Sequence, residues 1–161
     1  MKPKILIIND GGGFSFQTKC LTSDYEQDFD IFYLVPQDKD MNLTINTENS
    51  FPISKVTAIY NKSKAQKVIA FIKCFFQTTK ILRKNDYTSI IAIGTSTAVP
   101  VFMAAKLFKV KTVFIDSITR VNDLSQTAKI LLKLNLPTKT LTQWKSLSSP
   151  SDNIFYEGNI L

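Results

Sequence analysis

Short apolar runs that end in turn-forming residues predict most of the strands in this chain. The first run is apolar almost throughout and ends in Asn-Asp and three glycines, which is typical of a buried strand that enters a tight turn. On this pattern, strands are predicted over Lys4–Ile8, Phe29–Val35, Ser89–Ile93, Lys111–Ile115, Thr138–Thr142 and Asn153–Tyr156. We expect Pro36 to stop the second strand, and residues 37–63 to be irregular apart from one weak strand near Val56–Tyr60.

Segments with helical periodicity separate these strands. The longest is Lys64–Lys84, where apolar residues recur at helical spacing among basic side chains. Shorter helices are predicted over Phe16–Leu21 and Val99–Phe108, and from a cap at Asn122-Asp123 to about Leu134. Strands that alternate with helices in this way predict one α/β domain over residues 1–161, a Rossmann-like parallel sheet with helices on both faces.

One uncharged run, Tyr87–Ala105, is nominally long enough to cross a bilayer. Gly94–Thr97 and Pro100 interrupt it, so the run predicts a buried strand, a tight loop and the start of a helix. The four apolar residues that follow Lys4 are too few for a signal peptide. We therefore expect a cytoplasmic chain that is soluble or peripherally bound to a membrane.

The composition limits which catalytic groups, metal ligands and partners the chain can have. The formal charge is +7, and the chain contains no histidine, which removes the commonest general base near neutral pH and the commonest metal ligand. Cys20 and Cys74 match no zinc, iron–sulfur or redox spacing, so we expect two free thiols, no metal and no cofactor. A positive charge is typical of nucleic-acid binders, but the lysines are spread out and no recognition motif is present, so we expect no nucleic-acid partner.

Three polar loops follow predicted strands. In an open parallel sheet, loops at the carboxyl ends of the strands form the ligand site. The loops are Gly11, Gly12, Gly13, Phe14 and Ser15 after Asp10; Gly94, Thr95, Ser96 and Thr97; and Asp116, Ser117, Ile118, Thr119 and Arg120. Glycine N–H groups and hydroxyls suit an anion, although each loop also has a purely structural interpretation as a turn, a helix cap or an ion pair. None matches the dinucleotide fingerprint or a Walker loop.

Five segments in the second half of the chain carry a family resemblance. They are Gly94–Pro100, Ala105–Val121, Leu124–Leu131, Thr142-Gln143-Trp144 and Tyr156-Glu157-Gly158. In this order and at these spacings they resemble the Alg14-like proteins, which include bacterial capsule and exopolysaccharide proteins of the PssD and Cps14F types. The resemblance covers residues 65–161 well, and the first strand and glycine loop loosely.

The resemblance implies the acceptor-binding half of a GT-B glycosyltransferase, similar to the N-terminal domain of MurG. A separate Alg13-like or PssE-like chain would supply the half that binds the UDP-sugar. Together the two chains would transfer a sugar to a polyprenyl-diphosphate-linked glycan at the cytoplasmic face of a membrane. Hexosyltransferase activity is then expected only with the partner. The alternatives are a stand-alone Rossmann-like small-molecule enzyme and, after it, a basic nucleic-acid-binding domain.

This chain departs from the family at three points. Family members commonly have Gly-Gly-His in the first loop, where this chain has Phe14, so Asp10 is the remaining candidate for a catalytic base. Asp116 stands where a glutamate is usual. The N-terminal membrane anchor of eukaryotic members has no counterpart in the sequence.

The resemblance also implies roles for particular residues. We expect the first two loops to hold the acceptor diphosphate, Arg120 to add positive charge, and Asp116 to orient Arg120 or to contact the acceptor sugar. The partner surface is expected at the C-terminal segment, around Trp144, Tyr156 and Gly158. The basic, Phe-rich helix Lys64–Lys84 either packs on the sheet in the ordinary way or also binds an anionic membrane surface.

Overall fold

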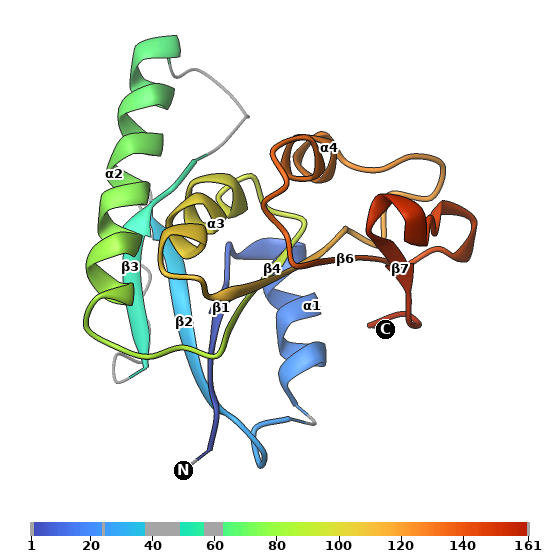
Figure 1. Ribbon diagram of the computed structural model, residues 1–161, viewed down its shortest axis with the longest axis horizontal. Coiled ribbons are helices and arrows are strands. Elements are labelled where there is room, and N and C mark those ends of the chain that lie inside the picture. Colours follow the sequence, from blue (N-terminus) through green and yellow to red (C-terminus); the bar gives the residue numbers. More distant parts are fainter. Residues whose placement is uncertain (1, 24, 38–48, 57–62, 161) are drawn as a thin grey trace.

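A single parallel sheet organises the chain (Figure 1). The computed structural model describes residues 2–23, 25–37, 49–56 and 63–160. Within these residues the strand order is β3-β2-β1-β4-β5-β6-β7, and every neighbouring pair is parallel. The strands are β1 (Lys4–Ile8), β2 (Asp30–Gln37), β3 (Ser50–Ser54), β4 (Ser89–Ile93), β5 (Lys111–Ile115), β6 (Lys139–Thr142) and β7 (Ile154–Tyr156).

The helices cover both faces of the sheet. They are α1 (Gly12–Thr22), α2 (Lys64–Leu82), α3 (Ala98–Leu107) and α4 (Gln126–Lys133), with short 3-10 turns at Lys145–Leu147 and Pro150–Asp152. The chain runs from β1 to β2 and β3 in one direction along the sheet, and from β4 to β7 in the other. Because parallel crossovers are right-handed, this reversal places α1 on one face and α2, α3 and α4 on the other, as Figure 1 shows.

The main core lies between the sheet and α2, α3 and α4. Phe102 of α3 and Phe114 of β5 are completely buried there, together with Leu6 and Ile8 of β1. The run Tyr87–Ala105 forms β4, a tight loop and most of α3, as predicted. The predicted fold class, a Rossmann-like parallel sheet with helices on both faces, is therefore confirmed.

Pro36 does not stop the second strand, contrary to the prediction. Strand β2 continues through it to Gln37, paired with β3. The Tyr33 N–H donates to the Asn49 carbonyl at 2.8 Å. The backbone N–H and C=O groups of odd-numbered residues of β2 therefore point toward β3, and those of even-numbered residues point toward β1. The donor missing at Pro36 therefore points toward β1, whose last paired residue, Ile8, lies opposite Leu34.

The edge strand β3 occupies Ser50–Ser54, ahead of the weak strand expected near Val56–Tyr60. Of that expected strand, residues 57–60 lie outside the described residues. Pro52 obscured β3 in the sequence, but a proline is tolerated on an edge strand when its nitrogen faces away from the ladder. The outward direction of the even-numbered residues is visible at Ser54, whose N–H donates to the Gln77 side chain of α2 at 2.8 Å.

Two helices begin at residues other than those predicted. Helix α1 begins at Gly12, inside the glycine run, four residues before the predicted Phe16. Helix α4 is capped by Ser125, whose hydroxyl accepts the Ala128 N–H at 3.1 Å, and not by Asn122-Asp123. Instead, the Asp123 carboxylate pairs with Lys129 on the surface, and this hydrogen bond lowers its pKa.

Candidate functional site

Strand order brings the three predicted loops to one edge of the sheet. Strands β1, β4 and β5 are consecutive neighbours and run in parallel, so their carboxyl ends lie side by side about 4.8 Å apart. The glycine loop, the loop at Gly94–Thr97 and the loop at Asp116–Arg120 leave these three ends in that order. In Figure 1 this edge lies at the top of the sheet. We call the surface formed by the three loops the crevice.

The glycine loop presents unpaired backbone donors at the start of α1. Gly11, the N-cap, has φ 75° and Gly12 has φ 58°, conformations that favour glycine. The first helical N–H groups, at Gly12, Gly13 and Phe14, have no hydrogen-bond partner within the described part of the chain. Gly12 and Gly13 are also exposed. With the helix dipole behind them, these donors suit an anion.

Phe14 closes the space between the first and second loops. A Cβ added to Gly94 would lie 2.3 Å from a carbon of the Phe14 ring, and Gly94 itself has φ 60°. The ring therefore packs directly on the Gly94 backbone, an approach that only glycine allows. Phe14 is one of the expected site residues, but its side chain has no polar atom. It can therefore offer a ligand only its backbone N–H, while its ring packs on Gly94.

A buried carboxylate links the first two loops. The Asp10 side chain is only 8% exposed, and its Oδ2 accepts the Thr95 hydroxyl. Its Oδ1 lies 3.1 Å from Nζ of Lys55, which follows β3. Lys55 therefore reaches across β2 to a residue that follows β1. Lys55 was not among the predicted site residues, because no strand was predicted just before it.

The hydroxyls of the second loop are used inside the protein. Thr95 bonds Asp10, and the Ser96 hydroxyl donates to the Val56 carbonyl, which ties the end of β3 to this loop. Thr97 is completely buried, and its hydroxyl has no partner within the described residues. The hydroxyls of Thr95 and Ser96 are thus already hydrogen-bonded within the protein, and that of Thr97 is buried.

In the third loop Asp116 is buried and hydrogen-bonded, whereas Arg120 is exposed and lies near enough to the Asp123 carboxylate to contribute to lowering its pKa. Asp116 is 1% exposed, and its two carboxylate oxygens accept the N–H groups of Ser117 at 2.9 Å and Ser125 at 2.8 Å. Its carboxylate therefore orders the loop and the start of α4, and the described residues show no ion pair between it and Arg120. Arg120 is exposed, and no carboxylate of the described residues forms an ion pair with it. The Ser117 hydroxyl hydrogen-bonds that of Thr119 at 3.0 Å.

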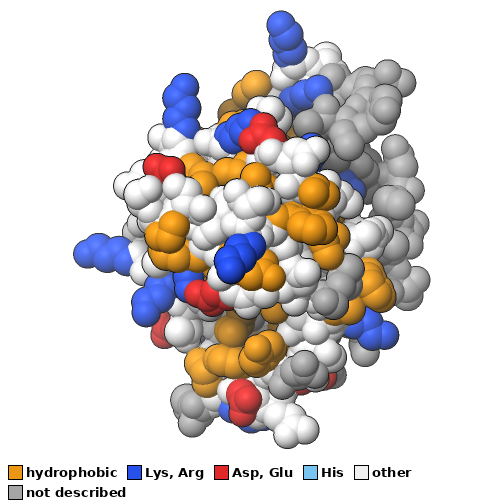
Figure 2. Space-filling model, turned by 90° about the vertical axis from the view of Figure 1, so that its right-hand side faces the viewer, with side chains coloured by type: hydrophobic (Ala, Val, Ile, Leu, Met, Phe, Trp, Pro, Cys, Tyr) orange, Lys and Arg blue, Asp and Glu red, His pale blue; other side chains and the backbone are white. Residues whose placement is uncertain are grey.

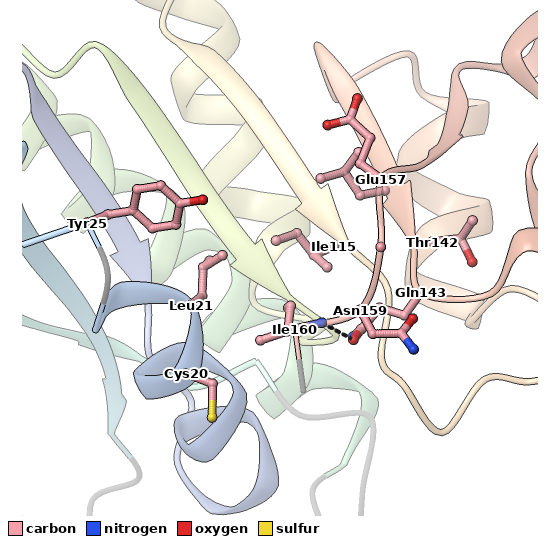
Figure 3. Close-up of a pocket in the computed structure, with 11 residues that line it drawn as sticks. Cys20, Leu21, Tyr25, Ile115, Thr142, Gln143, Glu157, Asn159 and Ile160 are labelled. Carbon is pink, nitrogen blue, oxygen red and sulfur yellow. Dashed lines mark hydrogen bonds between the residues drawn. The ribbon is translucent and has the colours of Figure 1, made fainter.

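A buried glutamine joins the crevice to the C-terminal segment. Gln143 is 2% exposed, and its amide nitrogen donates at 2.9 Å both to the Gln17 side chain of α1 and to the Asp116 carbonyl. Its amide oxygen accepts the Ile160 N–H at 3.2 Å, the bond drawn in Figure 3. Gln143 belongs to the Thr-Gln-Trp segment of the family resemblance, but no local pattern around it predicts this bridging position.

The residues expected at the partner surface lie in different surroundings. Trp144 is half-buried, and its indole N–H donates at 2.7 Å to the Ile118 carbonyl, so it braces the loop that carries Arg120. Tyr156 is 38% exposed, and Gly158 is exposed with φ 107°. Figure 2 views the molecule from the side where β7 and the C-terminus lie in Figure 1, and shows hydrophobic patches between charged side chains.

A cavity of about 290 Å³ lies on the α1 face of the sheet, beside the C-terminal segment. Figure 3 shows Leu21 and Tyr25 on one side of it and Glu157 and Asn159 on the other, with Ile115 between them. Its lining mixes apolar and polar side chains, among them the titratable Cys20, Tyr25 and Glu157. It was not predicted from the sequence, because it forms between segments that are distant along the chain.

Helix α2 carries an exposed apolar stripe: Val68, Ile69, Ile72 and Phe76 are 56%, 52%, 46% and 63% exposed. Gln77 of α2 bonds Ser54, the last residue of β3. Because α2 runs antiparallel to β3, the turns before Gln77 extend past the end of the strand, on the crevice side, by up to about 20 Å (Figure 1). None of the helices in the described residues is both long enough and apolar enough to traverse a bilayer.

Comparison with known proteins finds one matching family and solved structures with a similar fold. A sequence profile described as "Oligosaccharide biosynthesis protein Alg14 like" matches residues 41–160. MurG from Acinetobacter baumannii superposes with a TM-score of 0.71 at 13% identity, over 96% of this chain and 45% of MurG. UDP-N-acetylglucosamine 2-epimerase from Rickettsia bellii superposes with a TM-score of 0.68 at 14% identity, over 99% of this chain and 46% of the epimerase. None of the curated proteins matches the chain in sequence.

At these identities the two solved structures show a shared fold only. The chain spans about half the length of each, so it corresponds to one half of a GT-B-like protein.

Proposed function

This chain belongs to the Alg14-like family of oligosaccharide biosynthesis proteins, and we propose that it is the acceptor-binding subunit of a two-chain glycosyltransferase. Its substrate would be a polyprenyl-diphosphate-linked glycan, and an Alg13-like or PssE-like partner would bring the UDP-sugar. The observation that carries the proposal is the crevice, where the first N–H groups of α1 and the exposed Arg120 stand at the same sheet edge. This combination of backbone donors and a guanidinium suits a diphosphate.

In this proposal the diphosphate lies across the ends of β1, β4 and β5. Its oxygens accept from the N–H groups of Gly12, Gly13 and Phe14, where the helix dipole favours negative charge. Arg120 approaches from the third loop, held there by the Asp116 and Trp144 hydrogen bonds that order that loop. The backbone of the second loop forms the floor, with Gly94 beneath the Phe14 ring.

Sugar transfer requires that the acceptor hydroxyl lose its proton as it attacks the donor sugar. Asp10 is the proposed base in this chain, since it is the carboxylate that borders the glycine loop and since Asp116 is fully committed to backbone donors. The partner chain would add the groups that bind the UDP leaving group.

The acceptor's lipid chain must remain in the membrane while its diphosphate occupies the crevice. The apolar stripe of α2 lies at and beyond the crevice edge, among basic residues such as Lys64 and Lys73. Exposed apolar side chains beside lysines favour an anionic lipid surface. We therefore assign α2 as the element that docks the subunit on the membrane, peripherally and on its cytoplasmic face.

The proposal is tested by Arg120→Ala in the pair reconstituted with an Alg13-like partner, a panel of UDP-sugars and a prenyl-diphosphate-linked sugar. Loss of the guanidinium should lower transfer about 100-fold, because a charge that stabilises the bound diphosphate is removed. The circular dichroism spectrum and melting temperature should stay unchanged, since Arg120 is exposed.

Lys111→Ala is the matched control. It removes a positive charge from the same strand-and-loop unit, but at the opposite end of β5, so transfer should be normal. Full transfer by Arg120→Ala would contradict the assignment of the crevice.

A further inference from the structure

The proposed diphosphate site contains an electrostatic conflict. Asp10 immediately precedes the glycine run whose N–H groups would hold the diphosphate, and its carboxylate is almost completely buried. A buried carboxylate at this place would repel a second anion and would occupy the positive end of the α1 dipole. The crevice can bind a diphosphate well only if this charge is compensated within the protein.

Lys55 provides the compensation. Its Nζ lies 3.1 Å from Asp10 Oδ1, and that oxygen makes no hydrogen bond to any described residue, so the ammonium group is the partner it has. The Lys55 side chain is itself only 22% exposed, which limits screening of the pair by solvent. The other oxygen, Oδ2, is held by Thr95.

The backbone around Lys55 fixes the direction of this contact. The Lys55 N–H donates to the Gln37 carbonyl at 3.2 Å, which continues the β2–β3 ladder one residue past β3. The next residue, Val56, is tied to the second loop by the Ser96 hydroxyl. The end of β3 is thus anchored on both sides, and Lys55 is directed inward across β2 and not into solvent.

We propose that Lys55 is a positioning residue of the acceptor site: it neutralises and orients Asp10, and so makes the glycine loop able to bind an anionic acceptor. This inference rests on the proposed function. It assigns Lys55 a task different from that of Arg120, which would contact the diphosphate itself. Lys55 acts on the ligand only through Asp10.

The assignment makes a compensation test possible. Pyrophosphate is titrated calorimetrically into the full chain at fixed ionic strength, for wild type and for Lys55→Met, Lys55→Arg, Asp10→Asn and the double variant Lys55→Met/Asp10→Asn. Lys55→Met should weaken binding about tenfold, because it leaves a buried carboxylate uncompensated beside the ligand. Lys55→Arg should bind normally, and the double variant should return close to the wild-type affinity, because both charges are then absent.

Lys133→Met, at the end of α4, removes a positive charge far from the crevice and should leave binding unchanged. Unchanged affinity in Lys55→Met, with wild type binding normally, would overturn the role of Lys55 alone. The role of Lys55 would also be overturned if Lys55→Met weakened binding and the double variant Lys55→Met/Asp10→Asn did not restore it. Lys55 would then contact the phosphate directly. If the wild-type chain binds no pyrophosphate, the acceptor site proposed above fails, and this inference fails with it.

Discussion

Asp10 and Asp116 are both buried aspartates at the crevice, and their partners give them different tasks. Asp116 accepts two backbone N–H groups, and no cationic side chain of the described residues forms an ion pair with it, so it acts as a permanent part of the loop. Asp10 is held by a hydroxyl and an ammonium group, both on side chains from other strands' loops. Its negative charge also reaches the core beneath: burial raises the pKa of Cys74 to about 12, the Thr78 hydrogen bond lowers it, and Asp10 raises it further.

At the same scale, Asp116→Asn should destabilise the protein by about 2 kcal/mol. The amide would retain one acceptor oxygen but would turn an NH₂ group toward one of the two backbone N–H donors. Urea unfolding followed by circular dichroism measures the change. Asp123→Asn is the matched control, since Asp123 pairs with Lys129 at the surface and such pairs contribute little. Equal effects of the two substitutions would show that Asp116 does not hold the loop.

At the scale of elements, α2 has both a side that packs in the core and an apolar side that is exposed. It packs on β3 and α3 through a narrow buried side that includes Cys74, Thr78 and Leu82, and it leaves an apolar stripe in solvent. A capping box between Ser63 and Gln66 holds its N-terminal end, which projects past the sheet. The helix therefore does not depend on the exposed stripe for its own formation.

For this reason, Ile72→Ser/Phe76→Ser should fold normally yet bind membranes poorly. Each exposed side chain would lose about 2 kcal/mol of transfer free energy into lipid, so co-sedimentation with anionic liposomes at low salt should fall at least about tenfold. Ile130→Ser/Leu134→Ser removes apolar residues of α4 and its C-cap that are 46% and 47% exposed, and should leave liposome binding intact. Failure of the wild-type chain to co-sediment would refute the docking role of α2.

At the scale of the whole molecule, the chain corresponds to about half of the two solved proteins that share its fold. In the proposed enzyme, the missing half must face the same carboxyl ends of the strands. The exposed Tyr156 and Gly158 lie close to that edge, on the segment that Gln143 and Ile160 tie back to the crevice. Partner contact there would also cover the cavity on the α1 face.

Light scattering should accordingly show a one-to-one complex with an Alg13-like partner. Tyr156→Ala should weaken that complex about tenfold, as expected for loss of an aromatic side chain from an interface. Phe108→Ala is a control of nearly equal exposure, 37% against 38%, located at the opposite end of the sheet. If Tyr156→Ala and Phe108→Ala bind the partner equally well, the C-terminal segment is not the interface.

The sequence by itself determined the elements whose information is local. The apolar runs at β1, β4 and β5, the periodicity of α2 and α3, and the glycine run at the start of α1 each carry their structure within a few residues, because burial on both faces and backbone freedom are properties of short segments. The lack of histidine likewise follows from composition alone. These features were enough to predict the fold class and the three loops.

Tertiary structure decided what depends on residues that are distant in the sequence. Pro36 and Pro52 are tolerated because of which neighbouring strand their nitrogens face, and this is settled only by the strand order. The Asp10–Lys55 pair joins the segments that follow two strands which are not neighbours, and Gln143 joins α1, the loop after β5 and the C-terminal segment. Such contacts leave no periodic pattern in the sequence, because a buried polar group is specified by its partner and not by the residues beside it.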